Sequence, residues 1–223
     1  MIGRRTFFLG GAAALLGGCT VTETTQPQVS AKPQIPELYQ VMYGPRPNER
    51  FPIPAVDLRQ VDPRYWRREV PDPTGERPGT VVVDTGTFYL YWTLEGGRAM
   101  RYGVGLGRDG FGWDGAARIP FKREWPTWTP PAEMIAREPE LEKYRDGMEP
   151  GLDNPLGARA LYLFEGKVDT LYRLHGTQEA YSIGRAVSSG CVRLLNQDII
   201  DLYNRVPNGT RVIVRPPSAA SLV

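Results

Sequence analysis

The prediction of fold and chemistry rests on two short stretches, Leu174-His175-Gly176-Thr177 and Ser188-Ser189-Gly190-Cys191-Val192-Arg193-Leu194. They contain the single histidine of the 223 residues and one of the two cysteines. A thiol reacts as its thiolate, and imidazole is the usual base near neutral pH. Taken alone, a cysteine is more often a small buried side chain and a histidine a structural one. Together, with a glycine beside each, they predict Cys191 as nucleophile and His175 as base.

The residues that flank the cysteine fit acyl transfer. Gly190 permits a tight backbone geometry, so the amides of Gly190 and Cys191 can point at a developing oxyanion. Arg193 shares a strand face with Cys191 if the segment is extended, where it supports the thiolate or binds a substrate carboxylate. The order of His175 before Cys191 does not fit papain-like peptidases, and the short spacing does not fit sortases.

Strand-forming stretches surround these residues. β-Branched and aromatic side chains with turn residues between them predict a β-meander over residues 80–84, 87–92 and 99–106. A hairpin over 160–164 and 169–174 would deliver His175 at a strand end. The 21 prolines and 25 glycines also favour a turn-rich, mainly β protein.

Helices are predicted outside these strands. The clearest spans 196–206, where apolar residues recur on one face and Asn196 can serve as N-cap. A second, over 131–144, is interrupted by Pro139. A short helical turn is predicted over 63–68 and a closing strand over 210–214.

The motifs together resemble the signature of the L,D-transpeptidase catalytic domain of the YkuD or ErfK type. The similarity begins upstream at 154–161 and covers about residues 79–215. Its elements are His175-Gly176-Thr177, Ile183-Gly184, the stretch 188–194, Asn196-Gln197-Asp198, Leu202-Tyr203 and 206–210. The resemblance implies a mainly β fold, a β-sandwich or barrel with one or two peripheral helices.

The resemblance also implies roles for the site residues. A peptidoglycan stem peptide would form a thioester on Cys191, with His175 as base and the carbonyl of Gly176 orienting the imidazole. Arg193 completes the implied catalytic set. Many family members carry a second histidine where this chain has Ser189, so His175 would perform all the acid–base work.

Further residues are candidates for oxyanion or substrate contacts. They are Gly190, Ser189, Ser188, Arg159, Asn154, Trp125 and Trp128. The two tryptophans belong to an insertion at 120–153. For them, ordinary packing and a role in walling a substrate cleft are equally favoured.

The N-terminus has the layout of an export signal. Arg4-Arg5 precedes a short apolar run, Phe7 to Leu16, that is far below the roughly 20 residues of a membrane span. The arginine pair also resembles a twin-arginine signal. Leu16-Gly17-Gly18-Cys19 is similar to a bacterial lipobox, which implies that Cys19 is acylated; an incidental cysteine after a plain signal is the alternative. Thr20 favours the outer over the inner membrane by the same resemblance.

These observations predict four regions: a signal peptide (1–18), a tether and domain edge (19–75), the catalytic domain (76–215) and a tail (216–223). The polar stretch to about Pro54 is expected to be extended, with compact structure starting near Gly79. Without the two leader arginines, 25 basic and 25 acidic side chains remain, which indicates no nucleic-acid partner. No metal site or cofactor is predicted.

The predicted function is an L,D-transpeptidase in the periplasm of a Gram-negative bacterium, anchored by lipid. It would release the terminal D-alanine of a tetrapeptide stem and pass the thioester to an amine. The acceptor could be diaminopimelate, giving a 3-3 cross-link, a lysine of a lipoprotein, or a free D-amino acid. Two alternatives remain: a hydrolase that uses the same Cys191 with water, and a non-catalytic, lipid-anchored peptidoglycan-binding protein.

Overall fold

The computed structural model describes residues 34–107, 114–188 and 190–217, without the side chain of Ser188. Signal, lipobox and the start of the predicted tether lie outside these residues. The described chain from Ile35 onwards is one compact unit. Among its helices, none is long and apolar enough to cross a membrane.

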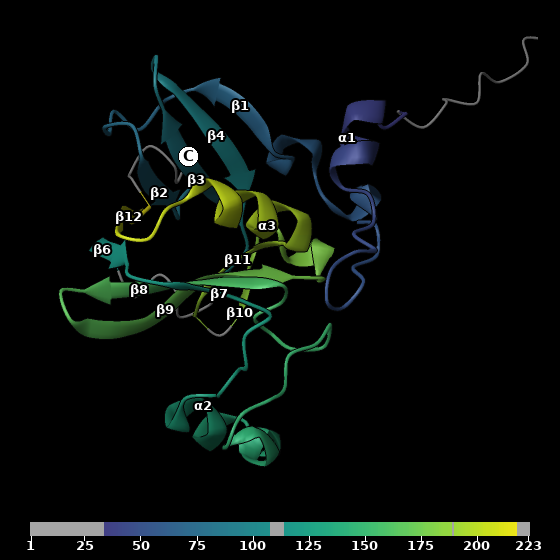
Figure 1. Cartoon of the computed structure of the whole chain (residues 1–223), viewed down its shortest axis with the longest axis vertical. Helices are drawn as coiled ribbons and strands as arrows, with labels where there is room; N and C mark the ends of the chain where they lie inside the picture. The colour runs from purple at the N-terminus through teal and green to yellow at the C-terminus, as the bar shows by residue number, and fades with distance from the viewer. Residues whose placement is uncertain (1–33, 108–113, 189, 218–223) are drawn as a thin grey trace, which may run out of the picture. The chain divides into compact units, whose positions relative to one another are not determined.

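Most described residues in regular structure are strands, as predicted (Figure 1). The larger sheet contains β1 (Arg68–Pro71), β2 (Thr80–Asp84), β3 (Tyr89–Leu94), β4 (Arg98–Gly103), β6 (Gly115–Ile119), β7 (Lys122–Glu124), β8 (Arg159–Glu165), β9 (Val168–Thr177), β11 (Val192–Leu195) and β12 (Thr210–Arg215). A small parallel pair is formed by β5 (Leu106–Gly107) and β10 (Ala186–Ser188). The mainly β prediction is confirmed.

The strand order is β1-β4-β3-β2-β12-β6-β8-β9-β11, and β7 also pairs with β8. The meander β2-β3-β4 and the hairpin β8-β9 are antiparallel, whereas β12 joins β2 and β11 joins β9 in parallel. The sheet curls until β11 meets the chain after β4. Gly105 and Arg193 exchange both backbone hydrogen bonds there, each 2.9 Å long. This contact is a single bridge rather than a ladder, so the fold is sandwich-like and not a closed barrel.

Helix α3 (Asn196–Arg205) packs on the curled sheet. Its fully buried Ile199 and Leu202, with Val206 just beyond it, join the main apolar core that the strands supply. The amphipathic helix is therefore as predicted. Its N-cap is not: Leu195 holds that position and makes no side-chain cap. Asn196 instead accepts a hydrogen bond from the Ala158 amide at 2.9 Å, because its side chain points into the fold.

Residues 35–54, the described part of the stretch that was predicted to be extended, fold together with residues 55–67. They contain α1 (Glu37–Met42) and two 3-10 turns, Leu58–Gln60 and Pro63–Tyr65, and they pack on the sheet domain. Tyr43, Ile53, Leu58, Val61 and Trp66 are all at most 7% exposed. These apolar side chains are too widely spaced to show a helical or strand period. Compact structure thus begins at Ile35 and not near Gly79 as expected.

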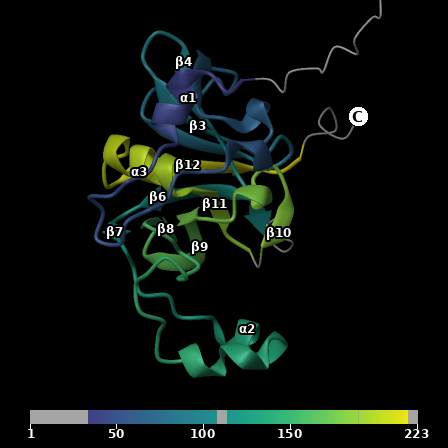
Figure 2. The same ribbon diagram turned by 90° about the vertical axis from the view of Figure 1, so that its right-hand side faces the viewer.

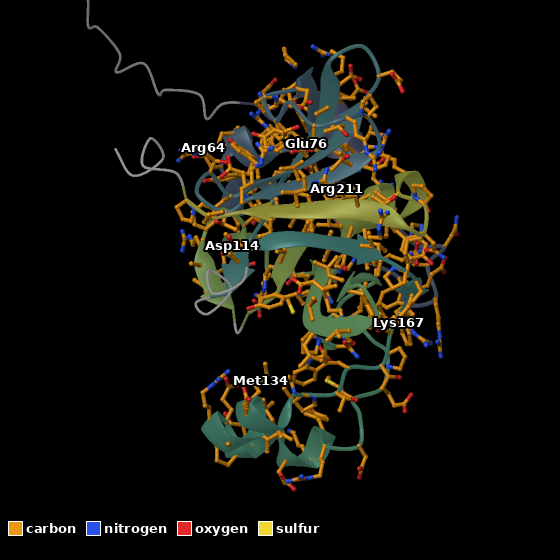
Figure 3. All side chains as sticks on the ribbon, turned by 90° about the vertical axis from the view of Figure 1, so that its left-hand side faces the viewer. Arg64, Glu76, Asp114, Met134, Lys167 and Arg211 are labelled. Atoms are coloured by element: carbon orange, nitrogen blue, oxygen red, sulfur yellow. The ribbon has the colours of Figure 1, made fainter. Side chains whose placement is uncertain are left out.

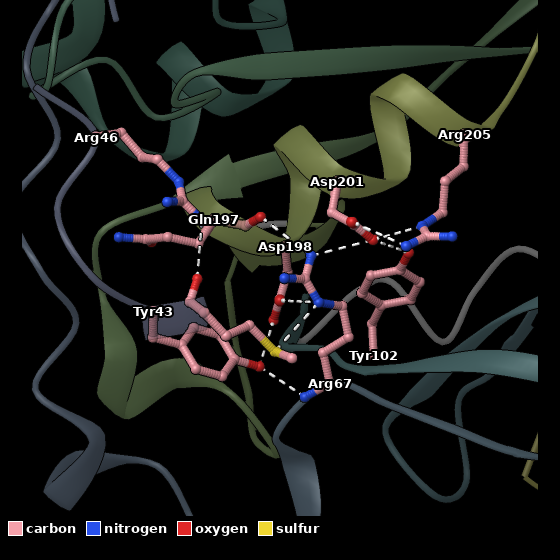
Figure 4. Close-up of polar contacts among 9 residues, drawn as sticks. Tyr43, Arg46, Arg67, Tyr102, Gln197, Asp198, Asp201 and Arg205 are labelled. Carbon is pink, nitrogen blue, oxygen red and sulfur yellow. Dashed lines mark hydrogen bonds and ion pairs between the residues drawn. The ribbon is translucent and has the colours of Figure 1, made fainter. Parts of the chain in front are cut away.

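A buried polar network holds this N-terminal segment on α3 (Figure 4). The Tyr43 hydroxyl donates to Asp198 at 3.1 Å and accepts from the Arg67 amide at 2.6 Å. The guanidinium of Arg67 lies 3.6 Å from Asp198 and 3.0 Å from Asp201. Because Asp198 is fully buried, these partners replace the water that its carboxylate would otherwise require.

Unlike the N-terminal segment, the insertion at 120–153 projects from the sheet. It contains α2 (Ala132–Arg137) and the 3-10 helix Pro139–Tyr144, the two pieces of the helix predicted over 131–144, divided beside Pro139. Two long connections join this part to the strands (Figure 2). Within its helices only Ile135 is buried, so few side chains fix it to the domain.

Candidate functional site

The pairing of β9 with β11 places the predicted catalytic residues on one face of the sheet. His175 is opposite Arg193 in the parallel register, and Cys191 lies two residues before Arg193. Side chains two residues apart along a strand share a face. Arg173 of β9 shares it too, and His175 and Cys191 line the same cleft. The long-range pairing thus brings together the two residues that the motifs predict to react.

The His175 ring is held by backbone. Its Nδ1 lies 2.9 Å from the Gly176 carbonyl oxygen, the group named from the resemblance. A carbonyl only accepts, so Nδ1 carries the hydrogen and Nε2 of the neutral ring keeps a lone pair. Burial lowers the pKa of His175 from 6.5 to about 4, although hydrogen bonds to the backbone of Gly176 and Pro155 oppose this shift. The imidazole is therefore a neutral base at neutral pH.

The tight packing around Gly176 explains why no other residue would serve there. A Cβ added to Gly176 would lie 2.2 Å from Asn196 Oδ1 and 3.0 Å from Ile199. Helix α3 thus presses on the peptide that orients His175. The sequence reasoning missed this contact and the part played by Pro155, since both depend on the packing of distant segments.

The Cys191 sulfur lies against an irregular turn of β9. The β8-β9 register shifts between Tyr162 and Phe164, so residues 170–172 bulge out of the ladder. Leu171 has φ +62°, a conformation that costs a branched side chain energy and is found at functional sites. Its carbonyl lies 3.9 Å from Sγ, and the Arg173 backbone also hydrogen-bonds the sulfur. The bulge therefore offers an acceptor for the thiol and a donor for the thiolate.

The resting charge of Cys191 follows from its surroundings. Burial raises the pKa of the thiol, while the Arg173 backbone and the positive charges of Arg173 and Arg193 lower it in part. Thiol and imidazole are thus both neutral at rest. Arg193 also pairs with Glu179 at 2.5 Å. Arg173 was missed by the sequence reasoning, although its place two residues before His175 on the same strand was a usable signal.

Gly190 has φ +145°, a backbone conformation that side chains rarely adopt. The backbone of Gly107 lies against it: a Cβ added to Gly107 would be 2.0 Å from the Gly190 nitrogen. The peptide before the thiol is thus positioned by β5. Ser189 and the side chain of Ser188 lie outside the described part of the chain, so their substrate roles stay predictions.

A cleft opens on both sides of the thiol. One part, about 540 Å³, extends along Leu171 and Tyr172, and another, about 440 Å³, reaches His175, Glu179 and Arg193. Both parts are lined by Trp128, Met134 and Leu156 as well as by Gly190 and Cys191. Met134 of α2 lies on the projecting insertion (Figure 3). The insertion therefore forms a wall of the cleft. For Trp128, this agrees with the predicted role in walling a cleft rather than with ordinary packing.

The other candidates, Asn154, Arg159 and Trp125, form hydrogen bonds within the protein. The Asn154 amide nitrogen lies 3.1 Å from three backbone carbonyls. Arg159 is held by Glu49 through two contacts of 2.8 and 2.9 Å. The Trp125 indole bonds the same carboxylate at 2.9 Å and packs on Phe51. These side chains shape loops, and none lines the cleft beside Cys191.

The described residues contain no group of three or more His, Cys, Asp or Glu side chains that could hold a metal ion. The groups that the site residues supply are a thiol, a neutral imidazole and backbone amides.

Comparison with known proteins gives the family. The model of the YkuD family, the L,D-transpeptidase catalytic domain, matches residues 78–214. The chain therefore belongs to the L,D-transpeptidase catalytic domain family, and the sequence resemblance is confirmed.

Individual proteins similar to this chain match it over only part of its length. The probable L,D-transpeptidase YbiS of Escherichia coli is 38% identical over 59% of this chain, and the match spans only 43% of YbiS. A putative L,D-transpeptidase of Fuscovulum blasticum is 39% identical over 60% of this chain and 68% of its own. A crystal structure from Brucella melitensis, of a probable carnitine operon oxidoreductase, is 43% identical, with a TM-score of 0.50 over 71% of this chain and 99% of that one.

Proposed function

We propose that this protein transfers peptidoglycan stem peptides through a thioester on Cys191. The observation that carries the proposal is the pairing of β9 with β11, which puts a neutral buried imidazole and a neutral thiol on one face of one cleft. A neutral base is what removal of a thiol proton requires. Membership of the family supports the peptide substrate.

The first half-reaction follows from these groups. Nε2 of His175 takes the Cys191 proton, and the thiolate attacks the carbonyl before the terminal D-alanine of a tetrapeptide. The developing oxyanion faces the amides of Gly190 and Cys191. The Gly176 and Pro155 backbone stabilises the imidazolium. The imidazolium then protonates the leaving D-alanine amine as the carbon–nitrogen bond breaks, which leaves a thioester and a neutral imidazole.

The second half-reaction repeats this chemistry in reverse. An acceptor amine attacks the thioester while His175 takes its proton, and the new amide forms as the Cys191 thiolate leaves. The proton returns to the sulfur. Water in place of the amine would hydrolyse the thioester, and the products would be shortened stems instead of new cross-links.

The test uses purified protein with isolated cell walls, followed by mass analysis of the muropeptides. New 3-3 dimers support the transferase, shortened stems the hydrolase, and unchanged muropeptides the binding protein. His175→Ala should lower the rate by about 10²–10⁴-fold. A stem-peptide or carbapenem adduct should map to the peptide that holds Cys191 and disappear in Cys191→Ser. Wild-type turnover in either variant would overturn the mechanism.

We also propose that Cys19 becomes an acylated N-terminus that anchors the domain in the periplasm. The similarity of Leu16-Gly17-Gly18-Cys19 to a lipobox supports this proposal. Intact-mass analysis of membrane-extracted protein should show the acyl chains, and Cys19→Ser should lose them. Recovery of the wild-type chain without acylation would contradict the anchor.

A further inference from the structure

A second hollow lies next to the catalytic cleft. It measures about 500 Å³ and is built by four parts of the chain: the N-terminal segment, β7 with the turn after it, the end of the insertion, and β8. Its lining residues are Arg50, Arg123, Glu124, Trp125, Pro126, Thr127, Pro150 and Tyr162. We call it the arginine hollow. Arg50 lies outside the segment that matches the family, so this part of the lining does not come from the catalytic domain.

Within the described part of the chain, the two arginines of the hollow lack a close acidic partner. Among the described residues, neither Arg50 nor Arg123 forms an ion pair. Each guanidinium instead lies near an aromatic ring, Arg50 at 5.2 Å from Phe51 and Arg123 at 5.6 Å from Phe121. Such contacts restrain the side chains without neutralising their charge. The hollow therefore presents positive charge that is free to attract an anion.

The nearby acids are already engaged by Arg159. Glu49 contacts Arg159 through both oxygens and also accepts from the Trp125 indole. Glu124, which lines the hollow, lies 3.8 Å from the same guanidinium. Arg159 is only 6% exposed and holds Glu49 in a close ion pair, while Glu124 stays largely exposed at the more distant contact.

The wall of the hollow is fixed by the same contacts. Trp125 has φ +42°, an uncommon conformation for a bulky residue. It is held by the Glu49 bond and by its amide, which donates to the Ala158 carbonyl at 2.8 Å. A strained and heavily anchored residue is a recognised mark of a functional surface.

The hollow adjoins the part of the cleft that runs along β9. Thr127 and Tyr162 line both spaces, and Cys191 lies in the second. Burial raises the pKa of the Tyr162 phenol, and the positive charges of Arg173 and Arg123 oppose this shift. A ligand that extends from the thiol past Tyr162 would bring its far end to the two arginines.

We propose that the arginine hollow is a carboxylate subsite, which binds an acidic group of the donor stem peptide while its reacting carbonyl lies at Cys191. This inference rests on the proposed function. A stem peptide that contains diaminopimelate carries free carboxylates beside the bond that reacts, and guanidinium is the side chain that best matches them.

The test measures binding separately from chemistry. The Cys191→Ser chain, with Arg50→Gln, Arg123→Gln or both, is titrated with a tetrapeptide stem and with the same peptide amidated at its side carboxylates. Each arginine substitution should raise the dissociation constant for the free acid by about tenfold. The amidated peptide should bind weakly to all four chains alike. Lys167→Gln is the matched control, because this exposed lysine lies at the β8-β9 turn, outside the hollow.

The same arginine variants with Cys191 intact provide the kinetic arm. Acylation by the stem peptide should show a raised KM with an unchanged kcat, while acylation by a compact carbapenem should stay as in the wild type. Equal KM values for variants and wild type would overturn the subsite, even though carbapenem labelling upholds the thioester. If neither compound labels Cys191, the proposed function fails, and the binding titration still decides the subsite. Loss of binding to anionic phospholipid vesicles, with peptide binding unchanged, would assign the hollow to lipid and overturn the proposal.

Discussion

The N-terminal segment and the insertion are both additions to the curled sheet, and they are attached in opposite ways. The segment 35–67 contributes a buried tyrosine and a buried arginine to a network on α3. The insertion contributes surface pairs such as Arg145 with Glu142, at 2.7 Å but more than half exposed. The N-terminal segment is thus held by buried contacts, whereas the contacts of the insertion are largely exposed.

The N-terminal segment and the insertion also contact the catalytic site in different ways. The first turn of α3 bonds the N-terminal segment through Gln197 and Asp198 and touches the Gly176 peptide through Asn196. The segment therefore supports the face that orients His175. The insertion meets the site directly, since Trp128 and Met134 line the cleft. We expect damage to the segment to reduce stability and damage to the insertion to reduce substrate use.

Removing the arginine of the network should have the largest effect. Arg67→Met leaves the carboxylate of Asp198, which is fully buried, without its cation. Breaking such a pair costs about 3–5 kcal/mol. Urea unfolding measures this loss. Arg145→Met, its counterpart in the insertion, should leave the unfolding midpoint unchanged; equal losses in the two variants would remove the contrast between the regions.

Acid should destabilise the catalytic face through His175. Its folded pKa of about 4 lies below the ordinary 6.5, so the unfolded chain binds more protons between these values. The contribution of His175 to the free energy of unfolding is complete above pH 6.5 and is lost as the pH falls towards 4. The full loss is about 3 kcal/mol. Thermal unfolding from pH 7 to 4 should show the loss, and His175→Ala should flatten that part of the curve. An unchanged slope in the variant would assign the loss to other groups.

Truncation in the insertion should separate substrate use from stability. Trp128→Ala removes a wall of both parts of the cleft but few core contacts, because the side chain is only partly buried. We expect kcat/KM for a stem peptide to fall about tenfold, equivalent to 1.4 kcal/mol. The urea midpoint should change little. A large loss of stability would show that the insertion is part of the folding core.

The smallest effect is expected for a neutral replacement in the network. Burial raises the pKa of Asp198 to about 7, while Arg67 opposes this shift. The amide of Asp198→Asn therefore mimics a form already present near neutral pH and should cost about 1 kcal/mol. Because the folded pKa lies above the ordinary 3.8, the folded chain binds more protons than the unfolded chain between these values, so the stability advantage of the wild type over the variant should widen as the pH falls from 7 to 5. A difference that narrows in acid would mean that the folded state requires the carboxylate form.

Much of the fold was predictable because its signals are local. Alternating β-branched and aromatic residues identified β2, β3, β8 and β9, and the apolar face identified α3. The N-terminal segment was not predictable in this way. Its buried residues, such as Tyr43 and Ile53, have no period and acquire their role from partners more than 100 residues away. Asn196 was misassigned as an N-cap for the same reason, since its partner is the distant Ala158 amide.

The sequence by itself determined the family and the two residues predicted to react, because the chain contains one histidine and the motifs around it and Cys191 are contiguous. Only the tertiary structure decided the rest: that Arg173 and the Leu171 bulge meet the sulfur, that Arg159 and Asn154 bond to neighbouring segments and do not line the cleft, and that Arg50 joins Arg123 in the adjoining hollow. The physical reason is that charge, burial and hydrogen bonding depend on distance in space, which strand pairing sets and the order of residues does not reveal.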